Sequence, residues 1–133
     1  MVKTKEGHML LLVEDDREMR SLICDELWDL GLQIKEAADG DEALQAVLDS
    51  RPDLILTDLR MPAGGFDYVA RLRTLAPACP IILMTAFGDA KTKAEALQRG
   101  VAAYFDKPVR MEEVRSAIKR LLDHHGDGDK LRG

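Results

Sequence analysis

Cysteine, an excess of positive charge and long apolar runs are all scarce or missing in this sequence. Its two cysteines, Cys24 and Cys79, are too few for a disulfide framework and indicate a reduced, cytoplasmic protein. No apolar run approaches the roughly 20 residues that span a bilayer, and the opening segment MVKTKEGH lacks the core of a signal peptide. Lysine and arginine number 19 against 24 aspartate and glutamate, a formal net charge of -5, which argues against direct binding of nucleic acid.

The length of the chain, 133 residues, is that of one domain. Its 46% hydrophobic and 32% charged residues supply enough apolar side chains for a core and show too little bias for disorder. The final segment, DHHGDGDKLRG, is polar and rich in glycine, which is typical of a flexible tail or the stub of a linker. We therefore expect an N-terminal extension over 1–8, one domain over 9–122 and a tail over 123–133.

Short apolar runs, each long enough for a strand, recur along the chain. Three of them, MLLLV, DLILT and PIILMT, are nearly continuous, as expected of parallel strands that are covered on both faces. Gln33-Ile34-Lys35 alternates instead, which predicts that the second strand lies at an edge of the sheet. The predicted strands cover 9–13, 32–37, 53–57, 80–85 and 101–105.

The segments between these runs repeat apolar residues in steps of three and four, which predicts helices. Gly31 follows the first helix as a C-terminal stop. The apolar positions of that helix are Met19, Leu22, Ile23, Leu27 and Leu30. The regular alternation of strand and helix predicts an α/β fold, a doubly wound five-stranded parallel sheet with five helices. A closed eightfold barrel would need about 250 residues, so the chain is too short for one.

Charged or hydroxyl side chains follow four of the predicted strands. Parallel strands end at one edge of the sheet, and ligands of open α/β sheets bind at that edge. Singly, each residue has an ordinary interpretation, such as Asp15 or Asp16 as a helix N-cap or Asp58 as a turn residue. Their joint position at one edge favours a functional site. The residues are Glu14, Asp15 and Asp16 after the first strand, Asp58 after the third, Thr85 and Ala86 at the fourth and Lys107 beyond the fifth.

Carboxylates gathered at that edge would repel one another. Two of them about 6 Å apart, at an effective dielectric near 20, raise the free energy by roughly 3 kcal/mol. Lys107 can neutralise one of these charges, and a divalent cation is suited to neutralise the rest. All candidate ligands are oxygens, which favours Mg²⁺ over zinc. Because Mg²⁺ typically takes one or two carboxylates together with phosphate oxygens, the pattern predicts a site for a phosphoryl group.

Four motifs lie in this order at the predicted strand ends: LLLVEDD, LILTDLRMP, ILMTAFG and AAYFDKPV. With these separations, the chain resembles the receiver domain of bacterial two-component response regulators over residues 9–122. The resemblance implies a flavodoxin-like, CheY-like fold with the strand order 2-1-3-4-5. It implies a cytoplasmic phosphoacceptor switch that assists its own phosphorylation and dephosphorylation, and not an enzyme.

The resemblance also implies a role for each matching residue at the metal site. Asp58 matches the aspartate that accepts the phosphoryl group and also touches the metal. Glu14 and Asp15 match the acidic pair that holds Mg²⁺. Arg60 matches the position whose backbone carbonyl completes the coordination, so its side chain is free to vary.

Four further residues match positions that contact or sense the phosphoryl group. Thr85 matches the hydroxyl that bonds it, Ala86 the small neighbour that leaves room for it, and Lys107 the lysine that pairs with one of its oxygens. Lys107-Pro108 is similar to the cis peptide of the family. Tyr104 matches the aromatic that swings inward when the threonine moves, so the readout face would be the fourth helix, fifth strand and fifth helix.

The implied mechanism is attack of the Asp58 carboxylate on phosphorus, in a phosphohistidine or a small acyl phosphate. The implied donor is a sensor histidine kinase or a phosphotransfer protein. The implied target is a downstream protein, or a fused output domain absent from this chain, and the domain would be a monomer or a phosphorylation-linked dimer.

The pattern departs from the family at two places. Glu14 stands where aspartate is commoner, which lengthens the reach of the carboxylate. After Met61-Pro62, the spacer before the glycine is one residue shorter than usual if Gly65 is the equivalent position. The family pattern therefore leaves the conformation of this loop open, together with the lifetime of the phosphorylated state.

Three other interpretations compete with this one. A phosphatase with an aspartate nucleophile needs a second acid two residues later, where this chain has Arg60. A flavin or dinucleotide module needs a glycine- or hydroxyl-rich loop after the first strand, where Glu14-Asp15-Asp16 would repel phosphates. A non-phosphorylated interaction module would not need the complete set of acids, threonine and lysine.

Overall fold

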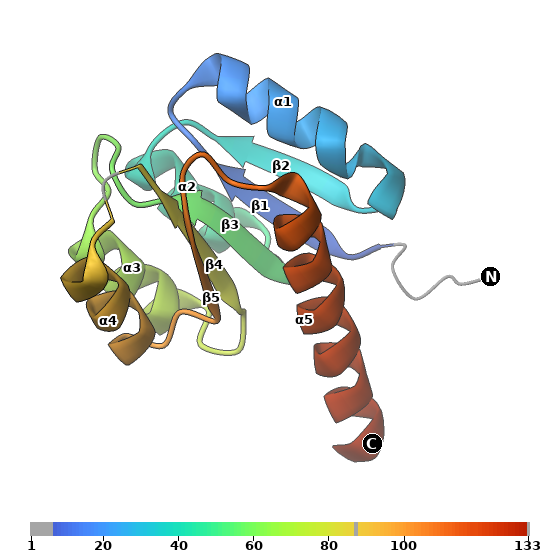
Figure 1. Cartoon of the computed structure of the whole chain (residues 1–133). Coiled ribbons are helices and arrows are strands. Elements are labelled where there is room, and N and C mark those ends of the chain that lie inside the picture. Colours follow the sequence, from blue (N-terminus) through green and yellow to red (C-terminus); the bar gives the residue numbers. More distant parts are fainter. Residues whose placement is uncertain (1–6, 87, 133) are drawn as a thin grey trace.

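Five parallel strands form the central sheet of the computed structural model, which describes residues 7–86 and 88–132 (Figure 1). Hydrogen bonds join the strands in the order β2-β1-β3-β4-β5. The predicted sheet is therefore confirmed, and β2 lies at an edge as its alternating pattern indicated. The strands are β1 (Met9–Val13), β2 (Gln33–Ala37), β3 (Leu54–Asp58), β4 (Ile81–Thr85) and β5 (Ala103–Asp106).

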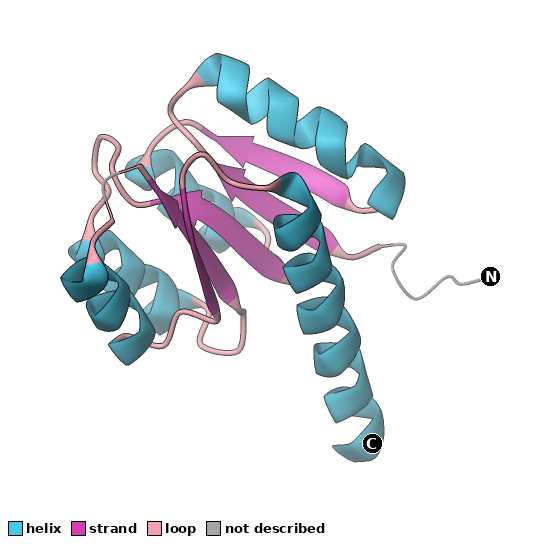
Figure 2. Cartoon of the chain, viewed as in Figure 1, coloured by secondary structure: helices cyan, strands magenta, loops and turns pink. Residues whose placement is uncertain are grey.

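Helices cover both faces of this sheet (Figure 2). Helices α1 and α5 lie on one face, and α2, α3 and α4 lie on the other (Figure 1). This is the doubly wound arrangement that right-handed βαβ connections produce. The helices are α1 (Arg17–Leu27), continued by the 3₁₀ turn η1 (Trp28–Leu30), α2 (Gly40–Asp49), α3 (Phe66–Leu75), α4 (Ala90–Gln98) and α5 (Met111–Arg132).

Alternate residues of the central strands pack against opposite helical layers. Leu11 and Ile55 belong to the cluster beneath α2, α3 and α4, whereas Leu10, Leu12 and Leu54 belong to the cluster beneath α1 and α5. All five side chains are at most 1% exposed. Burial of a side chain of this size contributes about 1.5–3 kcal/mol, so the two clusters hold the strand ends in fixed positions.

The expected start of the fifth strand was too early. Val101 is buried and apolar, but its N–H donates to the carbonyl of Ala96 in the turn that ends α4. Gly100 has a φ of 91°, the left-handed conformation that commonly ends a helix. The strand begins at Ala103 because the backbone of Val101 is already committed to this helix end.

The last helix ends later than its apolar pattern predicts. Val114, Ile118 and Leu122 form the buried stripe of α5, as expected, but the helix continues to Arg132. The expected tail therefore lies largely within α5, since no proline interrupts its backbone hydrogen bonding. Residues 1–6 of the expected N-terminal extension, and residue 133, lie outside the described residues.

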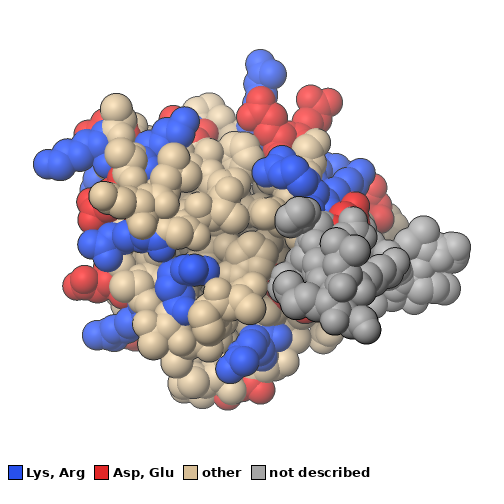
Figure 3. All heavy atoms as spheres, turned by 90° about the horizontal axis from the view of Figure 1, so that it is seen from below, with Lys and Arg blue, Asp and Glu red and all other residues tan. Residues whose placement is uncertain are grey.

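The molecular surface mixes charges of both signs. On the face shown in Figure 3, lysine and arginine side chains surround an area of uncharged residues and do not gather in one block. In the described part of the chain, no helix combines the length and the apolar character that crossing a bilayer requires.

Candidate functional site

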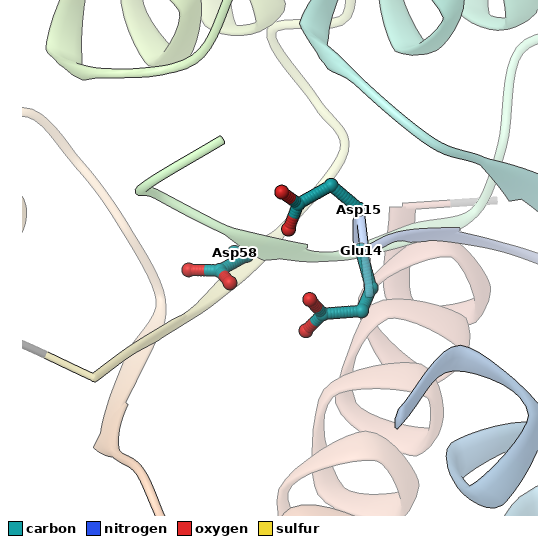
Figure 4. Close-up of side chains that lie close together, drawn as sticks. All are labelled: Glu14, Asp15 and Asp58. Carbon is teal, nitrogen blue, oxygen red and sulfur yellow. The ribbon is translucent and has the colours of Figure 1, made fainter. Parts of the chain in front are cut away.

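The carboxyl ends of β1 and β3 bring three acidic side chains together (Figure 4). Glu14 follows β1, and its N–H extends the sheet by donating to the Ala37 carbonyl at 3.1 Å. Asp58 is the last residue of β3. One carboxylate oxygen each of Glu14, Asp15 and Asp58 lies within 4.8 Å of the other two. Glu14 and Asp58 are 1% and 4% exposed, whereas Asp15 faces solvent.

Lys107 joins the two buried acids of this cluster. Its Nζ lies 2.7 Å from Glu14 Oε1 and 2.8 Å from Asp58 Oδ2. The Lys107 N–H donates to the carbonyl of Thr85 at 2.8 Å, and the peptide bond to Pro108 is cis, as the family resemblance implied. One ammonium therefore faces three carboxylates, which leaves the cluster with an excess of negative charge.

Burial and hydrogen bonding act against each other on these groups. Burial raises the pKa of the Glu14 carboxyl above its ordinary value, although hydrogen bonds from Lys107 and from the Asp16 N–H act to lower it. Burial acts to lower the pKa of Lys107, but its hydrogen bonds with Asp58 and Glu14 outweigh this effect and raise the pKa. Lys107 is therefore charged at neutral pH. The charged form of Glu14 is destabilised by its burial, and a further cation nearby would stabilise it.

Asp16 serves as the N-cap of α1, and this settles the choice between Asp15 and Asp16 that the sequence left open. The Asp16 carboxylate accepts the N–H of Met19 at 3.1 Å, and its own N–H donates to Glu14 Oε2 at 3.1 Å. Capping therefore occupies Asp16. Asp15 has no capping role in α1, and its carboxylate joins those of Glu14 and Asp58.

Arg20 is a residue of this site that the sequence analysis missed. From the first turn of α1, its guanidinium donates to the backbone carbonyl of Glu14 at 2.6 Å and to Glu36 Oε1 at 3.0 Å. The acidic segment after β1 is thereby tied both to α1 and to β2. In the sequence, Arg20 is marked only by its position one turn into the helix that follows the acidic pair. That position does not show that its side chain points back to Glu14.

The backbone around Asp58 is also held by specific contacts. The N–H of Arg60 donates to Asp58 Oδ1 at 3.1 Å. The Thr57 hydroxyl donates to the Asp58 carbonyl at 2.8 Å and bonds the Tyr68 hydroxyl at 2.8 Å. This buried pair links α3 to the last peptide of β3, and burial raises the pKa of Tyr68 above its ordinary value.

The remaining predicted residues lie along β4 and β5. Thr85 is fully buried as the last residue of β4, and Ala86 follows it in an exposed position. Tyr104 on β5 is partly buried against the layer of α2, α3 and α4. Burial and the neighbouring Asp106 carboxylate raise the pKa of Tyr104 to about 12. Its hydroxyl occupies the space where a side chain at Gly88 would stand.

Comparison with known proteins assigns this fold and site to a family. The family model described as the response regulator receiver domain matches residues 10–119. The chain therefore belongs to the response regulator receiver domain family. It is a receiver domain of the two-component type, a class of signalling domain that binds Mg²⁺ through acidic residues.

Individual relatives agree with this assignment. Sporulation initiation phosphotransferase F of Bacillus subtilis (strain 168) is 32% identical over 114 residues, which cover 85% of this chain and 92% of that protein. The phosphate regulon transcriptional regulatory protein PhoB of Pseudomonas aeruginosa is 32% identical over 126 residues, 92% of this chain but only 55% of the relative. A CheY-like receiver domain protein from Methanospirillum hungatei JF-1, 24% identical, has the same fold with a TM-score of 0.85 over 91% of this chain and 98% of its own.

Proposed function

We propose that Asp58 accepts a phosphoryl group in a Mg²⁺-dependent reaction and thereby switches the surface formed by α4, β5 and α5. The observation that carries this proposal is Lys107, which bonds Asp58 and Glu14 inside a cluster of three carboxylates. The donor would be a sensor histidine kinase or a phosphotransfer protein. The target would be a downstream protein or a fused output domain, with the chain acting as a monomer or a phosphorylation-linked dimer.

The donor set suits Mg²⁺. Glu14, Asp15, Asp58 and the backbone carbonyl of Arg60 would hold it, and all of these ligands are hard oxygens. The excess negative charge of the cluster and the raised pKa of Glu14 both favour an added cation. When bound, the ion supplies positive charge that stabilises the transferring phosphoryl group.

The proposed transfer is an in-line displacement. A carboxylate oxygen of Asp58 forms a bond to phosphorus while the bond from phosphorus to the donor's imidazole nitrogen breaks, and the electron pair of that bond stays on the imidazole. Lys107 Nζ compensates charge on the phosphoryl oxygens, and the Thr85 hydroxyl donates a hydrogen bond to one of them. The small side chain of Ala86 leaves room for the group, and the result is an aspartyl phosphate.

Signalling would follow from a population shift. A phosphoryl group that bonds Thr85 and Lys107 better in one conformation favours that conformation in an existing equilibrium. Tyr104 would report the change, because it lies on β5 next to the strand that carries Thr85. The output surface would then be α4, β5 and α5.

Phosphorylation by acetyl phosphate tests the proposed function directly. With Mg²⁺ present, the protein is expected to gain the mass of one phosphoryl group. A small acyl phosphate can replace the kinase as donor, because the residues proposed to catalyse the transfer all belong to this chain. Intact-mass spectrometry provides the measurement. EDTA should abolish the gain, and Mg²⁺ added in excess should restore it. Equal labelling with and without Mg²⁺ would contradict the metal-dependent reaction.

Removal of Arg20 should weaken Mg²⁺ binding. Arg20→Ala releases the Glu14 carbonyl, and loss of such a supporting contact typically costs roughly ten-fold in metal affinity. Isothermal titration with Mg²⁺ measures the change. Arg17→Ala removes the same charge from an exposed position three residues earlier, and it should leave the affinity near that of the wild type. An equal loss in both variants would assign the effect to net charge alone.

A further inference from the structure

The loop between β3 and α3 rests against the first residue of α2. The N–H of Gly40 donates to the Pro62 carbonyl at 3.0 Å. A Cβ atom at Gly40 would collide with the carbonyl oxygen of Ala63 and lie 2.6 Å from its carbonyl carbon. Because these are backbone atoms, no side-chain rotation could relieve the collision. Only glycine at position 40 allows the loop to sit where it does.

Hydrogen bonds within the β3–α3 loop connect the residues near Ala63 to Leu59 and Met61. The N–H of Gly64 donates to the Met61 carbonyl at 2.9 Å, and the N–H of Gly65 donates to the Leu59 carbonyl at 2.9 Å. Ala63 has a φ of 57°, a left-handed conformation that residues with a side chain rarely adopt. A collision at Ala63 would therefore be transmitted along the loop toward Leu59 and Arg60.

The start of α2, which the loop contacts at Gly40, is held by two side-chain hydrogen bonds. The Asp39 carboxylate accepts the N–H of Glu42 at 2.8 Å, and Glu42 Oε1 accepts the N–H of Ala38 at 2.9 Å. The Asp39 bond caps the helix, and the Glu42 bond ties its first turn to the residue before the cap, so that together they fix the start of α2. We therefore expect a side chain at Gly40 to move the loop more than the helix.

We propose that Gly40 is a positioning residue of the phosphoacceptor site. By having no side chain, it lets the β3–α3 loop seat on α2 and so places the backbone of Arg60, whose N–H bonds Asp58 Oδ1 at 3.1 Å. The consequence for the metal rests on the proposed function, in which the Arg60 carbonyl is a ligand. The consequence for the Arg60 N–H does not depend on it.

The variant Gly40→Ala tests this proposal in the whole 133-residue chain. We expect Mg²⁺ affinity by titration to fall roughly ten-fold, as for other groups that support a metal ligand. Without metal, the amide resonances of Leu59 and Arg60 should shift. Ala90→Gly is the matched control, since Ala90 is the first residue of α4 and follows the aspartate cap Asp89. It should change neither quantity. Wild-type affinity and an unmoved Arg60 resonance in Gly40→Ala would overturn the proposal.

Hydrogen exchange in the wild type provides a test that does not depend on the variant folding. The first N–H groups of a helix have no intrahelical acceptor and normally exchange fast. The Gly40 N–H should exchange slowly because Pro62 accepts it, compared with the N–H of Ala90. Equal exchange rates at Gly40 and Ala90 would contradict the contact between the β3–α3 loop and α2, and would overturn the proposal. If the wild type bound no Mg²⁺, the proposed function would fail, while the exchange rates and the Arg60 resonance would still decide the role of Gly40.

Discussion

Asp58→Asn is expected to abolish phosphorylation by acetyl phosphate. An asparagine amide lacks the carboxylate oxygen that forms the bond to phosphorus, whereas its size and shape are nearly unchanged. Lys107 would lose one of its two negatively charged partners but keep Glu14 at 2.7 Å, so the fold should persist. Intact-mass spectrometry with acetyl phosphate and Mg²⁺ should show no gain in mass, against the gain of one phosphoryl group in the wild type.

The control for this variant is Asp67→Asn in the first turn of α3. It makes the same chemical change at an exposed acid on the other side of the β3–α3 loop. Labelling of this variant should equal that of the wild type. Strong labelling of Asp58→Asn would instead assign the acceptor role to another residue.

Asp15→Ala is expected to remove the stabilisation that Mg²⁺ confers. A ligand at 100 times its dissociation constant stabilises the folded state by about 2.7 kcal/mol, so the wild type should unfold at a clearly higher temperature in Mg²⁺. Asp15 contributes an exposed carboxylate to the cluster, and neither capping nor Lys107 uses it. Its removal should therefore eliminate the metal effect without unfolding the protein.

Thermal unfolding with and without Mg²⁺ measures this effect. In metal-free solution, Asp15→Ala should be at least as stable as the wild type, because the variant has one fewer carboxylate in the repulsive cluster. Asp25→Ala, at an exposed position in the last turn of α1, should keep the full response to Mg²⁺. An unchanged midpoint of the wild type in metal would contradict the site.

Much of this fold could be predicted from the sequence because parallel strands buried on both faces leave a distinct signal. The continuous runs before Glu14 and Asp58 mark strands whose ends must share an edge of the sheet. The polar alternation at Gln33-Ile34-Lys35 identified one edge strand, because inner strands of a parallel sheet covered on both faces leave few side chains accessible. The acidic cluster followed from this topology alone, before any distance was known.

Other features depend on contacts that no local pattern encodes. Arg20 contacts the Glu14 carbonyl and Glu36 because α1 packs against the side of the sheet that carries β1 and β2. The sequence separation between Arg20 and these acids does not indicate such a contact. Gly40 and Ala63 are far apart in the sequence, so their collision is visible only in three dimensions. The predicted end of the last helix was wrong. The prediction followed the apolar side chains, which stop at Leu122, whereas the backbone hydrogen bonding of α5 continues to Arg132.

The β3–α3 loop illustrates both cases. The sequence predicts that this loop lacks a residue relative to the family pattern if Gly65 is the equivalent position, but it does not predict the path of the chain. The structure shows that path, with a left-handed residue at Ala63 and two backbone hydrogen bonds, to the carbonyls of Leu59 and Met61.

The proposed phosphoacceptor role of Asp58 can be checked by locating the residue that carries the phosphoryl group. Treatment of the phosphorylated wild type with borohydride reduces an acyl phosphate to an alcohol, and peptide mass spectrometry then locates the reduced side chain. We expect reduction at Asp58 alone, beside the ammonium of Lys107. Reduction at Glu14 or Asp15, or a stable label on another residue type with Asp58 unmodified, would contradict the proposed role.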